Sequence, residues 1–152
     1  MLTLSWFQSL VRREPQNGKS PRPKVRDTLG DRGENVAARY LRNQGFRILT
    51  RNFRCPLGEI DIVARDGRTL VFCEVKTRSY DDVGEDGRGV GVTPEDQVNT
   101  VKRHQISKAA RYYLSRYGTV PPPARFDVVA VVWPNNADPL IRHTPGAFEA
   151  SF

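Results

Sequence analysis

Residues 58–76, GEIDIVARDGRTLVFCEVK, constrain the fold more than any other stretch of the chain. The runs 58–64 and 69–76 are rich in Ile and Val, and the Asp66-Gly67 dipeptide between them is typical of a tight hairpin turn. The stretch is therefore predicted to form an antiparallel β-hairpin. Four charged residues interrupt its apolar pattern: Glu59, Asp61, Glu74 and Lys76.

A two-residue turn at Asp66-Gly67 fixes the faces of this hairpin, because side chains alternate between the two faces along each strand. Glu59 is then expected opposite Glu74. One face collects Ile60, Ile62, Val71, Cys73 and Val75. The other face collects Glu59, Asp61, Phe72, Glu74 and Lys76. Like charges directly opposite each other are destabilising, so the second face needs a cation.

That cation is either a basic side chain or a bound metal ion. Carboxylate oxygens suit Mg²⁺ or Mn²⁺, which keep water and substrate phosphates among their ligands. Lys76 lies two residues from Glu74 on the same face, where it can meet a water or a phosphate oxygen. Metal, water, lysine and phosphate together are the parts of a hydrolytic phosphodiesterase site. The alternative is that Lys76 simply pairs with Glu74 or Glu59 across an exposed sheet.

Two amphipathic helices are predicted on either side of the hairpin. The first has Asp31 as its N-cap, with Glu34 at the spacing of a capping box, and ends at Gly45. Glu34 thus has two alternative roles. It either caps the helix or, since it shares a face with Leu41, points toward the charged face of the sheet. The second helix is predicted over 93–117, with its N-cap at the first residue.

Further strands are predicted at 46–54 and 125–133, and the second is apolar enough to be buried on both faces. The element order α-β-β-β-α-β indicates one α/β domain over residues 29–135, with a central mixed sheet flanked by helices. Residues 1–28 are expected to form a flexible basic N-terminal tail. Residues 136–152 give no clear signal and are expected to form a C-terminal tail.

The net charge of +7, from 24 Lys and Arg against 17 Asp and Glu, favours an anionic partner. Nucleic acid is the first candidate and an anionic membrane surface the second. Basic side chains on the second helix and after the charged strand are candidates for phosphate contacts, although each also suits a solvated surface: Arg78, Lys102, Arg103, Lys108 and Arg111.

Cysteine content and hydropathy indicate the cellular location of the chain. Cys55 and Cys73 make neither a zinc site nor a disulfide framework, and buried free thiols in a reducing cytoplasm are expected. No apolar run approaches the roughly 18 residues of a membrane helix. The N-terminal residues lack the pattern of a signal peptide. A cytoplasmic protein that is not membrane-embedded is therefore expected.

GEID, then EVK at the end of the next strand, with a Glu in a preceding helix, resembles the PD-(D/E)xK nuclease superfamily with its restriction-endonuclease-like fold. More closely, the chain is similar to the YraN-like family of small bacterial proteins predicted to be endonucleases, which are related in fold to archaeal Holliday junction resolvases. The similarity covers about residues 29–133. The segments that carry it are RGENVAARYL, NFRCPLGEIDIVARDG, LVFCEVKTR, VTP and RFDVVAV.

The resemblance implies a role for each charged residue. Asp61 and Glu74 match the metal-binding carboxylates, the Val75 carbonyl matches a frequent backbone ligand, and Lys76 matches the motif lysine. Glu34 matches the helix glutamate of the resolvase-like branch. A Mg²⁺- or Mn²⁺-dependent endonuclease acting on nucleic acid, mainly DNA and including branched DNA, is implied, and a homodimer is compatible with it. A non-cleaving nucleic-acid-binding or protein-interaction module on the same fold is the alternative.

Overall fold

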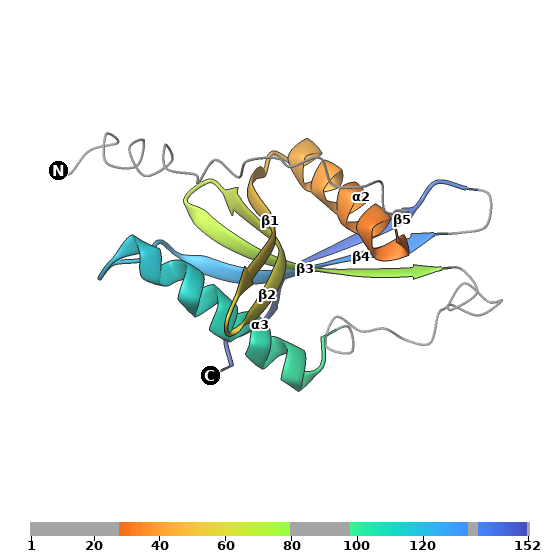
Figure 1. Ribbon diagram of the computed structural model, residues 1–152. Coiled ribbons are helices and arrows are strands. Elements are labelled where there is room, and N and C mark those ends of the chain that lie inside the picture. The colour runs from red at the N-terminus through yellow and green to blue at the C-terminus, as the bar shows by residue number, and fades with distance from the viewer. Residues whose placement is uncertain (1–27, 80–97, 134–136, 152) are drawn as a thin grey trace, which may run out of the picture.

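The computed structural model describes residues 28–79, 98–133 and 137–151. These residues form a five-stranded sheet with strand order β1-β2-β3-β4-β5 and a helix on each side (Figure 1). The elements are α2 (Leu29–Asn43), β1 (Arg47–Cys55), β2 (Gly58–Asp66), β3 (Thr69–Ser79), α3 (Thr100–Leu114), the 3-10 turn η2 (Ser115–Tyr117), β4 (Ala124–Trp133) and β5 (Leu140–Phe148).

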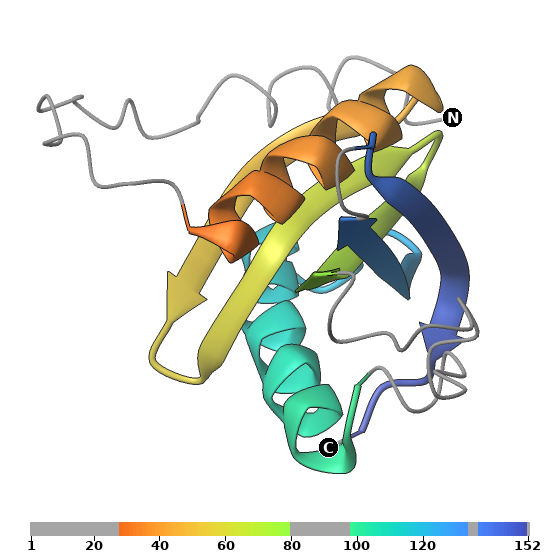
Figure 2. The same cartoon turned by 90° about the vertical axis from the view of Figure 1, so that its right-hand side faces the viewer.

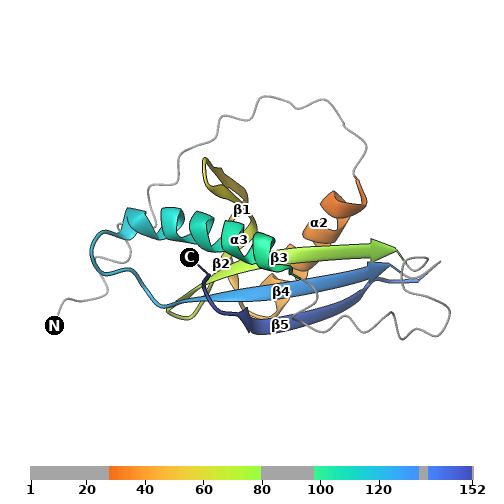
Figure 3. The same cartoon turned by 90° about the horizontal axis from the view of Figure 1, so that it is seen from below.

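Strands β3 and β4 are parallel, and all other neighbouring strands are antiparallel. The sheet is therefore mixed, and the predicted α/β fold with a restriction-endonuclease-like core is confirmed. Helix α2 lies over the face formed by the β1–β2 hairpin and β3 (Figure 2). Helix α3 crosses the opposite face, while β3, β4 and β5 run side by side beneath it (Figure 3).

Each face of the sheet buries its own apolar cluster. The cluster under α3 includes Phe72, Ile106 and Val128. The cluster under α2 includes Leu41, Val71, Cys73 and Val129. Neighbouring residues of β4 thus enter opposite clusters, which confirms that this apolar strand is buried on both faces. No helix in the described part of the chain is both long enough and apolar enough to span a bilayer.

The N-caps of both helices differ from those expected. The cap of α2 is Thr28, whose hydroxyl accepts from the backbone N–H of Asp31, while the Asp31 carboxylate accepts from the Thr28 N–H. Asp31 is therefore the third helical residue of a capping box, and Glu34 does not cap. Helix α3 is capped by Asn99 and begins at Thr100. The expected start at residue 93 lies outside the described residues, but Val98 and Asn99, expected inside the helix, precede it.

The register of the β2–β3 hairpin differs from the predicted one by two residues. Asp66 pairs with Thr69, so that the turn is Gly67-Arg68 and Asp66 is the last residue of its strand. Gly67 has φ 56°, which suits a two-residue turn with glycine first. The Arg125 guanidinium also holds the Asp66 carboxylate at 2.9 Å. A shift of two residues preserves the alternation of side chains, so Ile62, Val71 and Cys73 share a face as predicted.

Ile60 departs from the predicted face. It packs in the cluster under α3, whereas Ile62 packs under α2. Their partners on β1 are Phe53 and Arg51, and the residue between these two, Asn52, has φ 52°. This left-handed residue interrupts the extended geometry of β1. The side chains of the β1–β2 hairpin therefore change faces of the sheet at the level of Asp61.

Strand β5 lies within residues 136–152, for which a tail is expected from the sequence. It pairs antiparallel with β4 and adds the fifth strand to the sheet. Buried Asp127 on β4 accepts hydrogen bonds from the His143 ring and from the backbone N–H of Gly146. Contacts between residues distant in sequence fix this strand, and the local pattern of β5 does not reveal them.

Candidate active site

The site lies where the ladder between β2 and β3 ends. The paired residues run from Asp66 and Thr69 to Ile62 and Cys73. Immediately beyond, the carboxylate Oδ2 of Asp61 accepts a 2.8 Å hydrogen bond from the backbone N–H of Val75. A side chain thus takes the place of a backbone acceptor, which fixes Asp61 beside the EVK segment of β3.

Glu74 is the buried carboxylate of this segment, with a side chain only 4% exposed. The ammonium of Lys76 lies 3.0 Å from its Oε1, and that of Lys102 lies 3.4 Å from its Oε2. The Lys102 contact is an ion pair without hydrogen-bond geometry, so Oε2 is buried with no hydrogen-bond partner. The Lys76–Glu74 pair expected for an exposed sheet does form, but on a buried carboxylate.

The burial of the site and its charges change the pKa of Asp61. Burial, followed by repulsion from Glu74, raises the pKa of Asp61 from its usual 3.8 to about 7. The hydrogen bond from Val75 and attraction to Lys102 act in the opposite direction. The protein therefore holds two carboxylates close together at a cost that a further cation would relieve.

Lys102 reaches this group from α3, where its backbone N–H donates to the side chain of the N-cap Asn99. Its ammonium also lies 3.8 Å from Oε1 of Glu59. The helix can approach closely because residue 58 is glycine, and a Cβ there would meet the carbonyl oxygen of Gln105 at 3.0 Å. The sequence predicts Lys102 as a phosphate contact. In the structure its ammonium instead contacts the carboxylates of Glu59 and Glu74.

Glu34 approaches Asp61 from α2, which packs on the face that carries Val71 and Cys73, opposite the face on which the charged residues are predicted. The helix packs directly on β3 because residue 33 is glycine, and a Cβ there would clash with the side chain of Thr77. Oε2 of Glu34 lies 3.8 Å from a guanidinium nitrogen of Arg51 and, like that of Glu74, is buried without a hydrogen bond. The negative charge of Glu34 also contributes to the raised pKa of Asp61.

These residues fit a divalent cation, although they do not form a complete cage. The described ranges contain no group of three or more His, Cys, Asp or Glu side chains close enough to hold a metal. Mg²⁺, however, is usually held by only one or two carboxylates, with waters and substrate phosphates completing its shell. Asp61 and Glu74 supply that number, and the orphaned Oε2 of Glu74 lacks the hydrogen bond that a buried oxygen requires.

The other basic residues predicted to contact nucleic acid differ in their surroundings. Arg78 on β3 and Lys108 and Arg111 on α3 are exposed. Arg103 instead donates from Nε to the carbonyl oxygen of Val98 at 2.7 Å, and its guanidinium lies over the Phe148 ring. The structure therefore gives Arg103 a packing role and leaves the three exposed side chains at the surface.

Sequence comparisons give the family of this chain. Residues 33–131 match the family described as "Uncharacterised protein family UPF0102". The chain belongs to the UPF0102 family. This is the YraN family, so the resemblance noted in the sequence is confirmed.

UPF0102 proteins from several bacteria cover most of the chain. One from Geobacter sulfurreducens is 49% identical over 82% of this chain and 91% of its own length. One from Geotalea uraniireducens is 44% identical over 82% of this chain and 92% of its own length. One from Symbiobacterium thermophilum is 47% identical over 68% of this chain and 80% of its own length.

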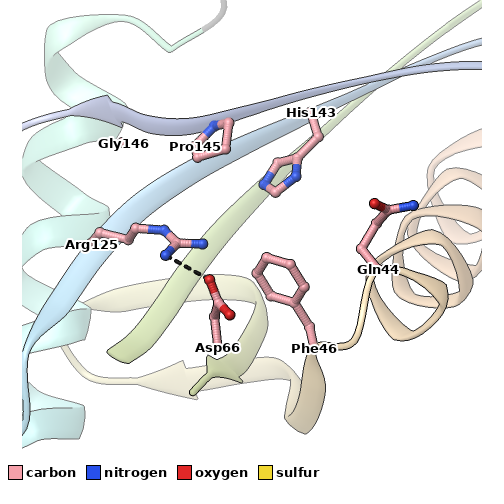
Figure 4. Close-up of a pocket in the computed structure, with 7 residues that line it drawn as sticks. All are labelled: Gln44, Phe46, Asp66, Arg125, His143, Pro145 and Gly146. Carbon is pink, nitrogen blue, oxygen red and sulfur yellow. Dashed lines mark hydrogen bonds and ion pairs between the residues drawn. The ribbon is translucent and has the colours of Figure 1, made fainter. Parts of the chain in front are cut away.

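This UPF0102 protein has a second polar cluster, at the other end of the β2–β3 hairpin. The Asp127 carboxylate, fully buried, accepts from Nε of Arg125 at 3.0 Å and lies 2.9 Å from Nε2 of His143. A hollow of about 590 Å³ lies beside it (Figure 4), lined by Gln44, Phe46, Asp66, Arg125, His143, Pro145 and Gly146. Every charged group of the cluster is paired with another, so it ties β4, β5 and the hairpin together.

Three basic partners of the carboxylates are missing from the sequence interpretation. Arg51 pairs with Glu34, Lys102 pairs with Glu74, and His143 pairs with Asp127. The first two depend on the approach of separate elements and leave no local trace. Asp127 has a signal, because it is the one acidic residue in the apolar run RFDVVAVVW, and a buried charge requires partners.

Proposed function

We propose that this UPF0102 chain is a metal-dependent endonuclease that hydrolyses phosphodiester bonds of nucleic acid, with DNA, including branched DNA, as its substrate. One observation carries the proposal. Asp61 and Glu74 are brought together where β2 and β3 stop pairing, with the Lys76 ammonium 3.0 Å from Glu74. A buried carboxylate beside a half-buried one, with a lysine at their edge, suits a divalent cation that acts on a phosphodiester.

Asp61, Glu74 and the carbonyl of Val75 would hold Mg²⁺ or Mn²⁺, with Glu34 adding a carboxylate from α2. Bound there, the cation would supply Lewis acidity and lower the pKa of a water ligand. Lys76 is 35% exposed, so its ammonium reaches solvent as well as Glu74. It would orient the attacking water and balance the negative charge that builds up on the phosphate.

Nucleic acid would be gripped through its backbone. Arg78, Lys108 and Arg111 are exposed, and such side chains contact phosphates without reading sequence. The free thiols Cys55 and Cys73 suit a reducing compartment, and we place the activity in the cytoplasm. A four-way junction has two-fold symmetry, so a homodimer would suit that substrate.

A second candidate function is a nucleic-acid-binding or protein-interaction module that does not cut. One observation favours it: Glu74 already has an ammonium near each of its oxygens, from Lys76 and from Lys102. A site neutralised in this way has less need of a metal ion. The same experiment separates the two functions.

The experiment is a cleavage assay on labelled linear duplex, single-stranded, flap and four-way junction DNA and on RNA, with Mg²⁺, Mn²⁺ or EDTA. Wild type is compared with Asp61→Asn and Lys76→Met, and Glu149→Gln removes an exposed carboxylate as a control. Metal-dependent cleavage by wild type and the control, lost in both site variants, is the expected result. Salt-dependent binding of DNA without cleavage would instead support the second function.

A further inference from the structure

We infer that Lys102 is a built-in competitor of the divalent cation: its ammonium holds the buried Oε2 of Glu74 until metal displaces it, and it thereby sets the metal affinity of the site. The inference rests on the proposed function, because it concerns the same carboxylates. It makes Lys102 a positioning residue for Glu74, distinct from the surface phosphate contacts on the same helix.

The two ammonium groups at Glu74 are held differently. Lys76 lies 3.0 Å from Oε1, whereas Lys102 lies 3.4 Å from Oε2 and makes no hydrogen bond to it. A buried carboxylate oxygen with only a loose ion pair is the more easily exchanged of the two. Of the two lysines, Lys102 is therefore the one that an incoming cation displaces.

Glu59 gives the displaced ammonium an alternative partner. It lies 3.8 Å from Nζ of Lys102, and its side chain is about half exposed, at 52%. Lys102 itself is 24% exposed, so its ammonium can turn from Glu74 toward Glu59 and solvent without being buried alone. Metal entry therefore does not require an unpaired buried charge, which would be costly.

The position of Lys102 in its helix supports a role in the site. It is the third residue of α3, and the first turn of this helix contains no acidic residue. A cation near a helix N-terminus opposes the helix dipole, so Lys102 does not serve the stability of α3. The favourable partners of its charge are the carboxylates of the site.

The test measures Mn²⁺ binding to the metal-free full chain, without nucleic acid, by calorimetry and by loss of the free Mn²⁺ electron paramagnetic resonance signal. Lys102→Met is expected to bind Mn²⁺ more tightly than wild type, by about 3- to 10-fold, because a partly exposed ion pair no longer has to be broken. Arg39→Gln, which removes one positive charge from the exposed side of α2, is the control and is expected to match wild type within about 2-fold.

Glu59→Gln provides a second variant. It removes the alternative partner of the ammonium, so Mn²⁺ binding is expected to weaken by a few-fold, and most of this effect is expected to vanish when Lys102→Met is also present. A purely structural lysine would not couple to Glu59 in this way. If Lys102→Met fails to fold, as judged by circular dichroism, Glu59→Gln alone decides: unchanged or tighter binding overturns the inference.

The results separate failure of the inference from failure of the proposed function. If wild type binds Mn²⁺ and Lys102→Met binds it equally or more weakly, the competitor role is wrong while the metal site stands. If neither wild type nor any variant binds Mn²⁺, both the metal-dependent function and the inference are overturned.

Discussion

Gly33 on α2 lies directly against the side chain of Thr77 on β3, with no room between them for a methyl group. This contact sets the depth at which α2 rests on the sheet. Because Glu34 is the next residue, the same contact sets how closely its carboxylate approaches Asp61.

Gly33→Ala is therefore expected to lower the free energy of unfolding by about 1–3 kcal/mol, since the helix must move away from the sheet. Gly30→Ala on the same helix is the matched control. A Cβ at residue 30 meets only the Thr28 hydroxyl at 3.7 Å, so alanine is expected to stabilise the helix slightly, by about 0.5–1 kcal/mol. Urea denaturation of both variants checks the pair, and equal effects would contradict the close contact.

Asp61→Asn is expected to stabilise the metal-free protein at alkaline pH. The folded pKa of Asp61 is raised to about 7 from 3.8, so its contribution to stability is fully present below pH 3.8 and is lost as pH rises through 7. In EDTA at pH 8 the variant is expected to exceed wild type by on the order of 2 kcal/mol. At pH 5 the difference is expected to be much smaller. Denaturant titrations at both pH values measure it, and a difference independent of pH would count against a raised pKa.

Asp127→Asn is expected to destabilise the fold. Burial raises the pKa of the Asp127 carboxyl, but hydrogen bonds from His143, Arg125 and Gly146 outweigh it, and the pKa lies below 3.8. Its stabilising contribution is thus present above pH 3.8 and is lost as pH falls through the lowered value. The variant is expected to lose about 2–4 kcal/mol at pH 7 and to show a weaker acid dependence below pH 4. Exposed Asp138→Asn serves as the control in thermal and acid unfolding.

Lys108→Gln is expected to weaken binding of all DNA sequences alike. The side chain is exposed on α3, and a single phosphate contact contributes about one unit to the slope of log affinity against log salt. Fluorescence anisotropy at several salt concentrations is expected to show that slope reduced by about one. Arg39→Gln on the exposed side of α2 is expected to leave the slope unchanged. A loss of affinity with the same slope would place Lys108 outside the phosphate contacts.

The faces of β3 are predictable from the sequence because side chains alternate along a strand. The register of the hairpin differs by two residues from the predicted one, yet Val71 and Cys73 share a face opposite to that of Phe72, since a shift of two preserves the alternation. The helix cap is less predictable. Two acidic residues three apart, Asp31 and Glu34, allow two starts for α2, and the Thr28 hydroxyl decides between them.

Strand β5 and the position of Lys102 lay beyond local sequence reasoning. β5 contains Pro145 and Gly146, which weaken a strand pattern and are tolerated at the edge of a sheet. The pairing of Lys102 with Glu74 depends on how close α3 comes to β2 at Gly58, and that distance is set by packing. Features that depend on two elements meeting in space leave little trace in either segment.

The hydrogen bond from Val75 to Asp61 gives the protein a natural reporter. The amide proton of Val75 points at a carboxylate oxygen, unlike its neighbours in the ladder, which point at backbone carbonyls. Its resonance in a nitrogen–proton correlation spectrum will therefore shift when the Asp61 carboxylate binds a proton or a cation. A single backbone signal can thus be read as an indicator of the state of the site, without any added label on a side chain.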